Sequence, residues 1–110
     1  MRTRSIAVLL AVIVAVVVAV PALAVTKITG TVGPGFTISK SKPTKAGKYT
    51  LVVSDKSSIH DFHLKGPGVN VKTGVGTKGS KTFTITVKKG KYTFVCDPHA
   101  STMHGSFTIK

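Results

Sequence analysis

The chain has 110 residues, which is enough for one small domain. Lysine and arginine number 16 against three acidic residues, and the formal net charge is +13. A chain with a single cysteine cannot form an internal disulfide, and these counts exclude a multidomain enzyme, a disulfide scaffold and a coiled coil.

The N-terminal segment has the layout of a secretory signal peptide. A short positive stretch precedes residues 6–20, which are all Ala, Val, Leu or Ile. Pro21 then interrupts the apolar run, and Ala22-Leu23-Ala24 offers the small residues that a signal peptidase reads. A retained membrane anchor is the alternative, because the apolar stretch reaches about 20 residues. We expect residues 1–24 to be a signal peptide or an anchor, and residues 25–110 to lie outside the cytoplasm, as a periplasmic, secreted or cell-surface domain.

The segment 25–110 is strongly basic. It holds 14 Lys and three Asp, a net charge of +11, and it has no Arg or Glu. Proteins that recognise nucleic acids favour arginine and exposed aromatic residues. Because this segment has no arginine, we expect no nucleic-acid partner. The charge predicts attraction to an acidic partner protein or to anionic cell-surface material, through a field that salt screens.

Beyond residue 25 the pattern is that of half-buried β-strands. Residues 81–87 alternate strictly, with Phe83, Ile85 and Val87 on one face. Residues 88–91 are typical of a tight turn, and no stretch of the segment shows a helical repeat. Short strands between Gly, Pro and Ser turns indicate a small antiparallel sandwich or barrel. The other sets predicted to face inward are Tyr49, Leu51 and Val53; Tyr92, Phe94 and Cys96; and Phe107 and Ile109.

Three residues near the C-terminus could bind a metal. Cys96 is followed by His99 three residues later and by Met103 four residues after that. Two His and one Cys in a plane, with a weak axial Met, form the ligand set that selects copper for electron transfer. A second His must therefore come from elsewhere, and residues 58–64 contain two candidates.

Strand parity separates the candidate histidines. His60 shares a face with Phe62 and Leu64, whereas His63 points the other way and is expected to face solvent. Near the C-terminus, Met103 is in phase with Phe107 and Ile109, so we expect Met103 to point inward. His104 is then expected to face solvent, unless a β-bulge at Gly105 reverses the phase.

Residues 92–109, YTFVCDPHASTMHGSFTI, resemble the copper loop of the plastocyanin and amicyanin branch of the cupredoxins. Residues 58–64, SIHDFHL, resemble the segment that carries the first His of that family. The resemblance covers roughly residues 44–110. It implies a Greek-key β-sandwich and a single type 1 copper, held by His60, Cys96, His99 and Met103.

The sequence departs from the family pattern at two points. Three residues separate His99 from Met103, a spacing intermediate between the loops of plastocyanins and amicyanins. Asp61 stands where the family usually has an Asn that ties the two ligand segments together. Its backbone N–H can still donate to the Cys96 sulfur. Its carboxylate would lower the reduction potential unless it is protonated or paired with a Lys.

These observations favour an exported blue copper protein that carries electrons as copper cycles between Cu(I) and Cu(II). We expect a monomer with an acidic redox partner, and a membrane association only if the N-terminal segment is retained. Copper buffering, delivery or sensing is the alternative, and a metal-free adhesion domain is a third interpretation. We do not expect an enzyme, because oxidases and nitrite reductases need further copper centres and only His63 and His104 remain.

Overall fold

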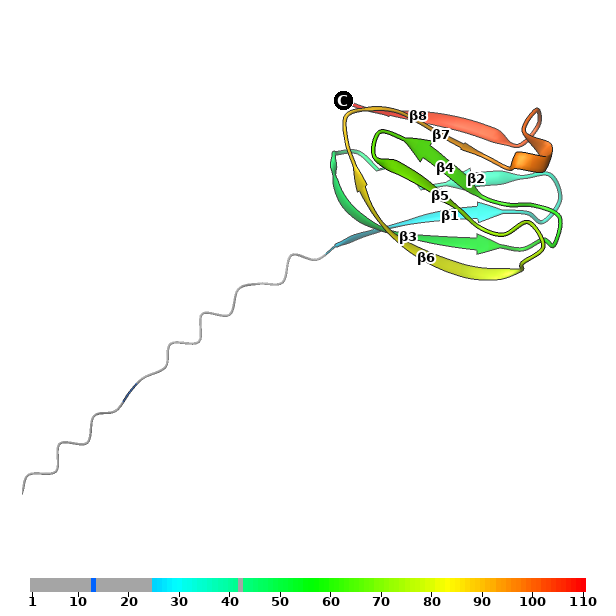
Figure 1. Cartoon of the computed structure of the whole chain (residues 1–110), viewed down its shortest axis with the longest axis horizontal. Coiled ribbons are helices and arrows are strands. Elements are labelled where there is room, and N and C mark those ends of the chain that lie inside the picture. Colours follow the sequence, from blue (N-terminus) through cyan, green and yellow to red (C-terminus); the bar gives the residue numbers. More distant parts are fainter. Residues whose placement is uncertain (1–12, 14–24, 42) are drawn as a thin grey trace, which may run out of the picture.

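The computed structural model describes residue 13, residues 25–41 and residues 43–110, so the expected signal peptide or anchor lies outside the described residues apart from Ile13. Two four-stranded sheets face each other in a sandwich (Figure 1). One short 3₁₀ turn, η1 (Asp97–His99), interrupts the strands. In the described part of the chain, no helix is long and apolar enough to cross a membrane.

The first sheet has the order β2-β1-β3-β6 and the second the order β5-β4-β7-β8. The strands of the first are β2 (Ile38–Lys40), β1 (Thr26–Val32), β3 (Gly47–Asp55) and β6 (Gly79–Val87). Those of the second are β5 (Val69–Lys72), β4 (His63–Gly66), β7 (Gly90–Val95) and β8 (His104–Ile109). The predicted all-β sandwich is confirmed.

One strand pair departs from the antiparallel expectation. β1 and β3 are parallel neighbours, whereas the other pairs are antiparallel. β2 runs back along β1 to the end where β1 began, so the chain enters β3 at that same end. Side-chain alternation has the same period in both arrangements, and it therefore could not predict the direction of this pair.

The core lies between the two sheets and consists of residues within 28–109. The predicted inward-facing sets are buried, except that Phe83 is only partly buried. Phe62 and Phe94 stack within the core at a ring-centroid distance of 6.1 Å, and Tyr92 stacks on Phe107 at 5.2 Å. The other buried apolar residues are Ile28, Val32, Tyr49, Leu51, Val53, Leu64, Val69, Ile85, Val87, Cys96, Met103 and Ile109.

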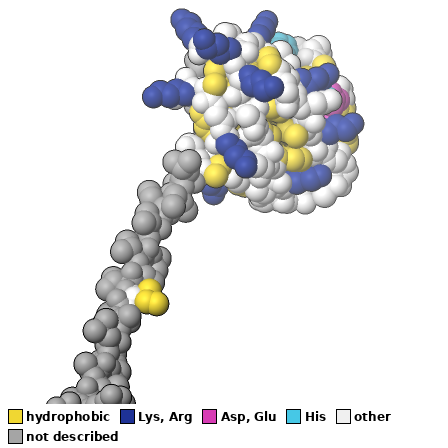
Figure 2. Space-filling model, turned by 60° about the vertical axis from the view of Figure 1, so that its left-hand side comes forward, with side chains coloured by type: hydrophobic (Ala, Val, Ile, Leu, Met, Phe, Trp, Pro, Cys, Tyr) yellow, Lys and Arg dark blue, Asp and Glu magenta, His cyan; other side chains and the backbone are white. Residues whose placement is uncertain are grey.

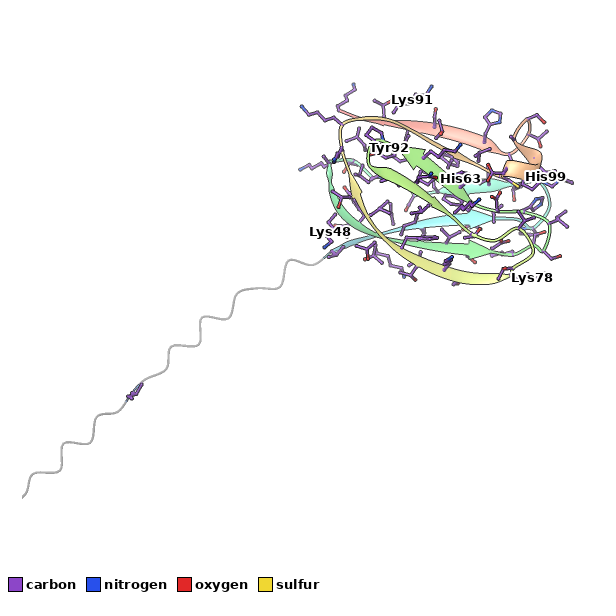
Figure 3. All side chains as sticks on the ribbon, viewed as in Figure 1. Lys48, His63, Lys78, Lys91, Tyr92 and His99 are labelled. Atoms are coloured by element: carbon purple, nitrogen blue, oxygen red, sulfur yellow. The ribbon has the colours of Figure 1, made fainter. Side chains whose placement is uncertain are left out.

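Four connections gather at one end of the sandwich, which we call the His99 end. They are residues 33–37, 56–62, 73–78 and 96–103. Figure 3 shows His99 at this end, with Lys48 and Lys91 at the opposite end. Residues far apart in the chain, including the predicted copper ligands, are therefore placed on neighbouring loops.

Gly105 allows β7 and β8 to pack closely beneath these loops. It pairs with Phe94 across the two strands, and a Cβ atom at this position would overlap the Phe94 ring. Because the ring is buried, Gly105→Ala forces it to move and should destabilise the domain by about 2 kcal/mol, lowering Tm by roughly 10 °C. Thermal unfolding measures the change. Gly76→Ala is the control, since a Cβ there meets open space, and equal effects of both variants would contradict the packing argument.

Candidate metal centre

Three donor atoms from two loops converge at the His99 end. The Nδ1 atoms of His60 and His99 lie 3.0 Å apart. The Cys96 sulfur lies 3.6 Å from His60 Nδ1 and 3.5 Å from His99 Nδ1. His60 and Cys96 are fully buried, and His99 is partly exposed at the end of η1. The structure thus brings together three of the four predicted ligands.

Backbone hydrogen bonds orient these donors. His60 Nε2 lies 2.6 Å from the carbonyl oxygen of Gly35, so its other nitrogen, Nδ1, faces the cluster. The N–H of Cys96 donates to the carbonyl of Met103 at 2.9 Å, and the N–H of Met103 donates to the carbonyl of His99 at 2.9 Å. The loop that carries Cys96, His99 and Met103 is therefore closed by its own backbone.

The spacing of the donors fits a metal ion between them. Donors bound at about 2.0–2.3 Å around a trigonal ion are separated by roughly 3.5–4.0 Å. Both distances from the Cys96 sulfur agree with this range, and the distance of 3.0 Å between the two histidine nitrogens is about half an ångström shorter. Thiolate with two imidazoles is a donor set that suits copper.

Met103 lies on the inner side of the loop and His104 on the outer side. The Met103 side chain is fully buried, whereas His104 is exposed and its Nδ1 lies 2.8 Å from the carbonyl of Ala100. β7 and β8 pair residue for residue from Gly90 with Ile109 to Val95 with His104, without a bulge. The predicted orientations of Met103 and His104 are confirmed, and ligation by Met103 stays a prediction.

We expect Met103→Leu to keep the blue colour of the copper protein and to raise its reduction potential. An axial thioether is a weak donor, and its loss disfavours Cu(II) more than it weakens binding. Visible spectroscopy and voltammetry measure both properties. His104→Ala is the control and should change neither, because its ring points away from the donors. If His104→Ala alters the colour and Met103→Leu does not, the axial assignment is wrong.

The expectation that His63 faces solvent is wrong. The residue is only 9% exposed, and both of its ring nitrogens have partners. Nδ1 lies 2.9 Å from an Asp97 carboxylate oxygen, and Nε2 lies 2.6 Å from Asn70 Oδ1. His63 points away from the core, as parity predicts, but η1 and β5 cover it on the outer face of the sheet.

Strand parity correctly predicted that His60 points inward, although His60 does not lie in a strand. β4 begins only at His63, so His60, Asp61 and Phe62 belong to the preceding loop. All three are buried, although strict alternation would place Asp61 outside. The N–H of Phe62 donates to Thr73 Oγ1 at 2.9 Å, and the N–H of Thr73 donates to the Phe62 carbonyl at 3.0 Å. These bonds fix the loop in place of strand pairing.

Asp61 ties the two ligand segments together. Its Oδ1 accepts a hydrogen bond of 2.6 Å from the N–H of Asp97, one residue after Cys96. Burial raises the pKa of Asp61 above its ordinary value, and its hydrogen bond to the Asp97 side chain raises it further. That same bond, with help from His63, lowers the pKa of Asp97. Of the two carboxyls, Asp61 is therefore the one that holds its proton more tightly.

The Cys96 sulfur is fully buried, and burial and two backbone N–H groups affect the pKa of its thiol in opposite directions. Burial raises the pKa of the Cys96 thiol above its ordinary value. The backbone N–H groups of Asp61 and His99 act in the opposite direction, because they favour the thiolate. The hydrogen bond from the Asp61 N–H to the sulfur stays a prediction.

Phe36 covers both histidine rings, a role that no sequence motif predicted. It lies between β1 and β2, its side chain is 60% exposed, and its ring centroid lies 4.9 Å from that of His99 and 5.4 Å from that of His60. Both contacts are edge-on. Phe36 and Gly35 precede residue 44, where the resemblance to the copper-binding family begins.

Comparison with known proteins agrees with this site. The family model described as "Copper binding proteins, plastocyanin/azurin family" matches residues 44–110. The chain belongs to this family, and the family together with the donor cluster defines one type 1 copper site. No match was found among curated proteins.

A solved structure supports the fold. The chain is similar to one from a study titled "Cryo-EM structure of a heme-copper terminal oxidase dimer provides insights into its catalytic mechanism". The TM-score is 0.53 at 17% sequence identity, and the match covers 79% of this chain and 66% of the other, slightly less than two thirds. At this identity the likeness concerns the fold alone.

Proposed function

We propose that the domain is an electron carrier in which His60, Cys96, His99 and Met103 hold the copper. The observation that carries this proposal is the convergence of the Cys96 sulfur and the two Nδ1 atoms, at 3.0–3.6 Å, in a buried pocket of loops. Copper bound there supplies a one-electron couple between Cu(II) and Cu(I). Transfer is fast when the surrounding donors move little between the two states.

The chain's own residues hold the donors in place. Gly35 fixes the His60 ring, and the Asp61 carboxyl joins the His60 loop to η1. His63 braces Asp97 from the outer side of the sheet. Among the donors, His99 is the partly exposed one, and with Phe36 beside it His99 is the point through which electrons enter and leave.

Electron self-exchange tests this function against copper handling. An electron carrier should show reversible voltammetry and line broadening in NMR spectra of mixed Cu(I) and Cu(II) protein. A protein that buffers or delivers copper would instead release the ion readily to a chelator and exchange electrons slowly. Slow self-exchange together with rapid release of copper would overturn the proposal.

We propose further that the carrier is exported, is monomeric and catalyses no reaction of its own. Export is supported by the apolar run at residues 6–20 and the small residues that follow Pro21. The proposal that it catalyses no reaction rests on the sequence, because copper oxidases and nitrite reductases need further copper centres built from many histidines and the chain has four. A second cluster in the described residues, of Asp61, His63 and Asp97, has its hydrogen bonds within the protein.

We expect an acidic redox partner, and its association rate should fall steeply as salt rises. A domain of net charge +11 attracts such a partner through a long-range field, and the Debye length shrinks from about 30 Å at 10 mM salt to about 8 Å at 150 mM. Stopped-flow reduction by an acidic electron donor measures this dependence. A rate that is constant between those two salt concentrations would contradict electrostatic docking.

A further inference from the structure

The carboxylates of the domain and half of its lysines lie at opposite ends. All three carboxyl side chains of residues 25–110 belong to the His99 end, where Asp55 ends β3, Asp61 lies in the next loop and Asp97 begins η1. The opposite end, which we call the lysine end, carries half of the 14 lysines. They are Lys27, Lys45, Lys48, Lys88, Lys89, Lys91 and Lys110, and all seven are exposed.

Strand register places these lysines together. Lys48 pairs with Thr86 near the start of β3, and Lys91 pairs with Thr108 near the start of β7. The turn between β6 and β7 is held by Tyr92, whose hydroxyl accepts from the Lys88 N–H at 2.8 Å and donates to the Pro67 carbonyl at 2.7 Å. Figure 2 shows Lys side chains projecting from the domain on the side where β1 begins. The lysines thus project from a rigid frame.

This arrangement differs from an ordinary soluble surface. Surfaces that serve solubility intersperse both signs of charge. In the part of the chain that the structure describes, no side-chain carboxylate lies within ion-pair distance of any of the seven lysines. Even with one charge subtracted for a terminal carboxylate beside Lys110, this end carries about +6. Such a field strongly attracts a surface of fixed negative charge.

We propose that the lysine end binds a bilayer rich in anionic headgroups and directs the His99 end away from it. β1 begins at this end, so the apolar run at residues 6–20 joins the domain here, and a bilayer holding that run would face these lysines. β3 spans the sandwich with nine residues, so about 26 Å separates the lysine end from the His99 end. The net charge of the domain speeds the approach of an acidic electron partner, but a partner that stayed on the lysine end would be too far from His99 to exchange electrons. A membrane on the lysine end leaves His99 accessible to that partner.

Vesicle binding by residues 25–110 tests the proposal without the apolar run, since the core lies within residues 28–109. The probe is phosphatidylcholine vesicles with or without 30% phosphatidylglycerol. The test variant replaces Lys48, Lys88, Lys89 and Lys91 with Gln. A control of equal net charge replaces lysines nearer the His99 end, namely Lys56, Lys72, Lys78 and Lys81. Unchanged Tm values show that both variants fold.

The wild type should sediment with the anionic vesicles, remain free with the neutral ones, and be released by 0.5 M salt. Each lysine near an anionic surface raises partitioning about fivefold. The test variant should therefore bind at least 50-fold more weakly, and the control less than fivefold more weakly. Equal losses would show an effect of net charge alone and overturn the proposal. Binding to polyglutamate without binding to anionic vesicles would also overturn it, in favour of an acidic protein.

Discussion

Cys96→Ser should abolish the intense visible band of the copper-loaded protein while the metal-free domain remains folded. The band arises from charge transfer between the Cys96 thiolate and copper, and a serine hydroxyl is a hard, weakly acidic ligand that cannot replace it. The substitution is nearly isosteric, and the backbone N–H groups that favour the thiolate can also stabilise the hydroxyl oxygen. Absorption spectra of both proteins with one equivalent of Cu(II) measure the loss.

Thermal unfolding of the metal-free variant supplies the control. Its Tm should stay within a few degrees of the wild type, because Cys96 contributes one small buried side chain among sixteen apolar core residues. Added copper should raise the Tm of the wild type more than that of the variant, since binding to the folded state stabilises it. A serine variant that kept the intense band would show that another group forms the chromophore.

Asp61→Asn should stabilise the metal-free domain at pH 8 by about 1–3 kcal/mol and leave its stability at pH 3 nearly unchanged. Burial raises the pKa of Asp61, so the folded state holds this proton more tightly than the unfolded state does. The wild type therefore loses stability as pH rises through the ordinary value of 3.8 toward the raised one. An amide keeps the acceptor for the Asp97 N–H and adds a donor toward its carboxylate, without a charge to bury. Urea unfolding at both pH values measures the difference.

Asp97→Asn is the matched control, and its expected effect on stability at pH 8 is opposite to that of Asp61→Asn. Because its hydrogen bond to Asp61 and the neighbouring His63 lower the pKa of Asp97, this carboxylate stabilises the fold above the ordinary pKa. That contribution is lost as pH falls through the lowered value. Asp97→Asn should therefore destabilise the domain at pH 8 and have little effect at very low pH. The assignment of the proton to Asp61 fails if the two variants change stability in the same direction at pH 8.

Strand alternation was sufficient to predict the sandwich, its core sets and the inward position of Cys96 and Met103. The period of two specifies which residues share a face, and it needs no knowledge of strand partners. It could not predict the parallel pairing of β1 with β3, which depends on how the chain returns along β2.

The contacts around the site could not be predicted from the sequence, for a different reason. His63, Asp97 and Asn70 are linked by contacts between β4, η1 and β5, and no local pattern encodes such contacts. Phe36 and Gly35 reach the histidines from a loop that is 24 residues away from His60 in the chain. Cys96, His99 and Met103 were predicted as ligands because their spacing is local and chemically distinctive, whereas the contacts that support the site depend on tertiary packing.

Titration of Cu(II) into the metal-free protein, followed by visible spectroscopy, tests the central claim most directly. The donors at the His99 end predict an intense thiolate-to-copper charge-transfer band that grows to one equivalent and then stops. The band should disappear on reduction with ascorbate and return on oxidation, since a carrier passes one electron each way. Copper that binds without this band, or a band that does not reappear on oxidation, would contradict a type 1 electron-transfer site.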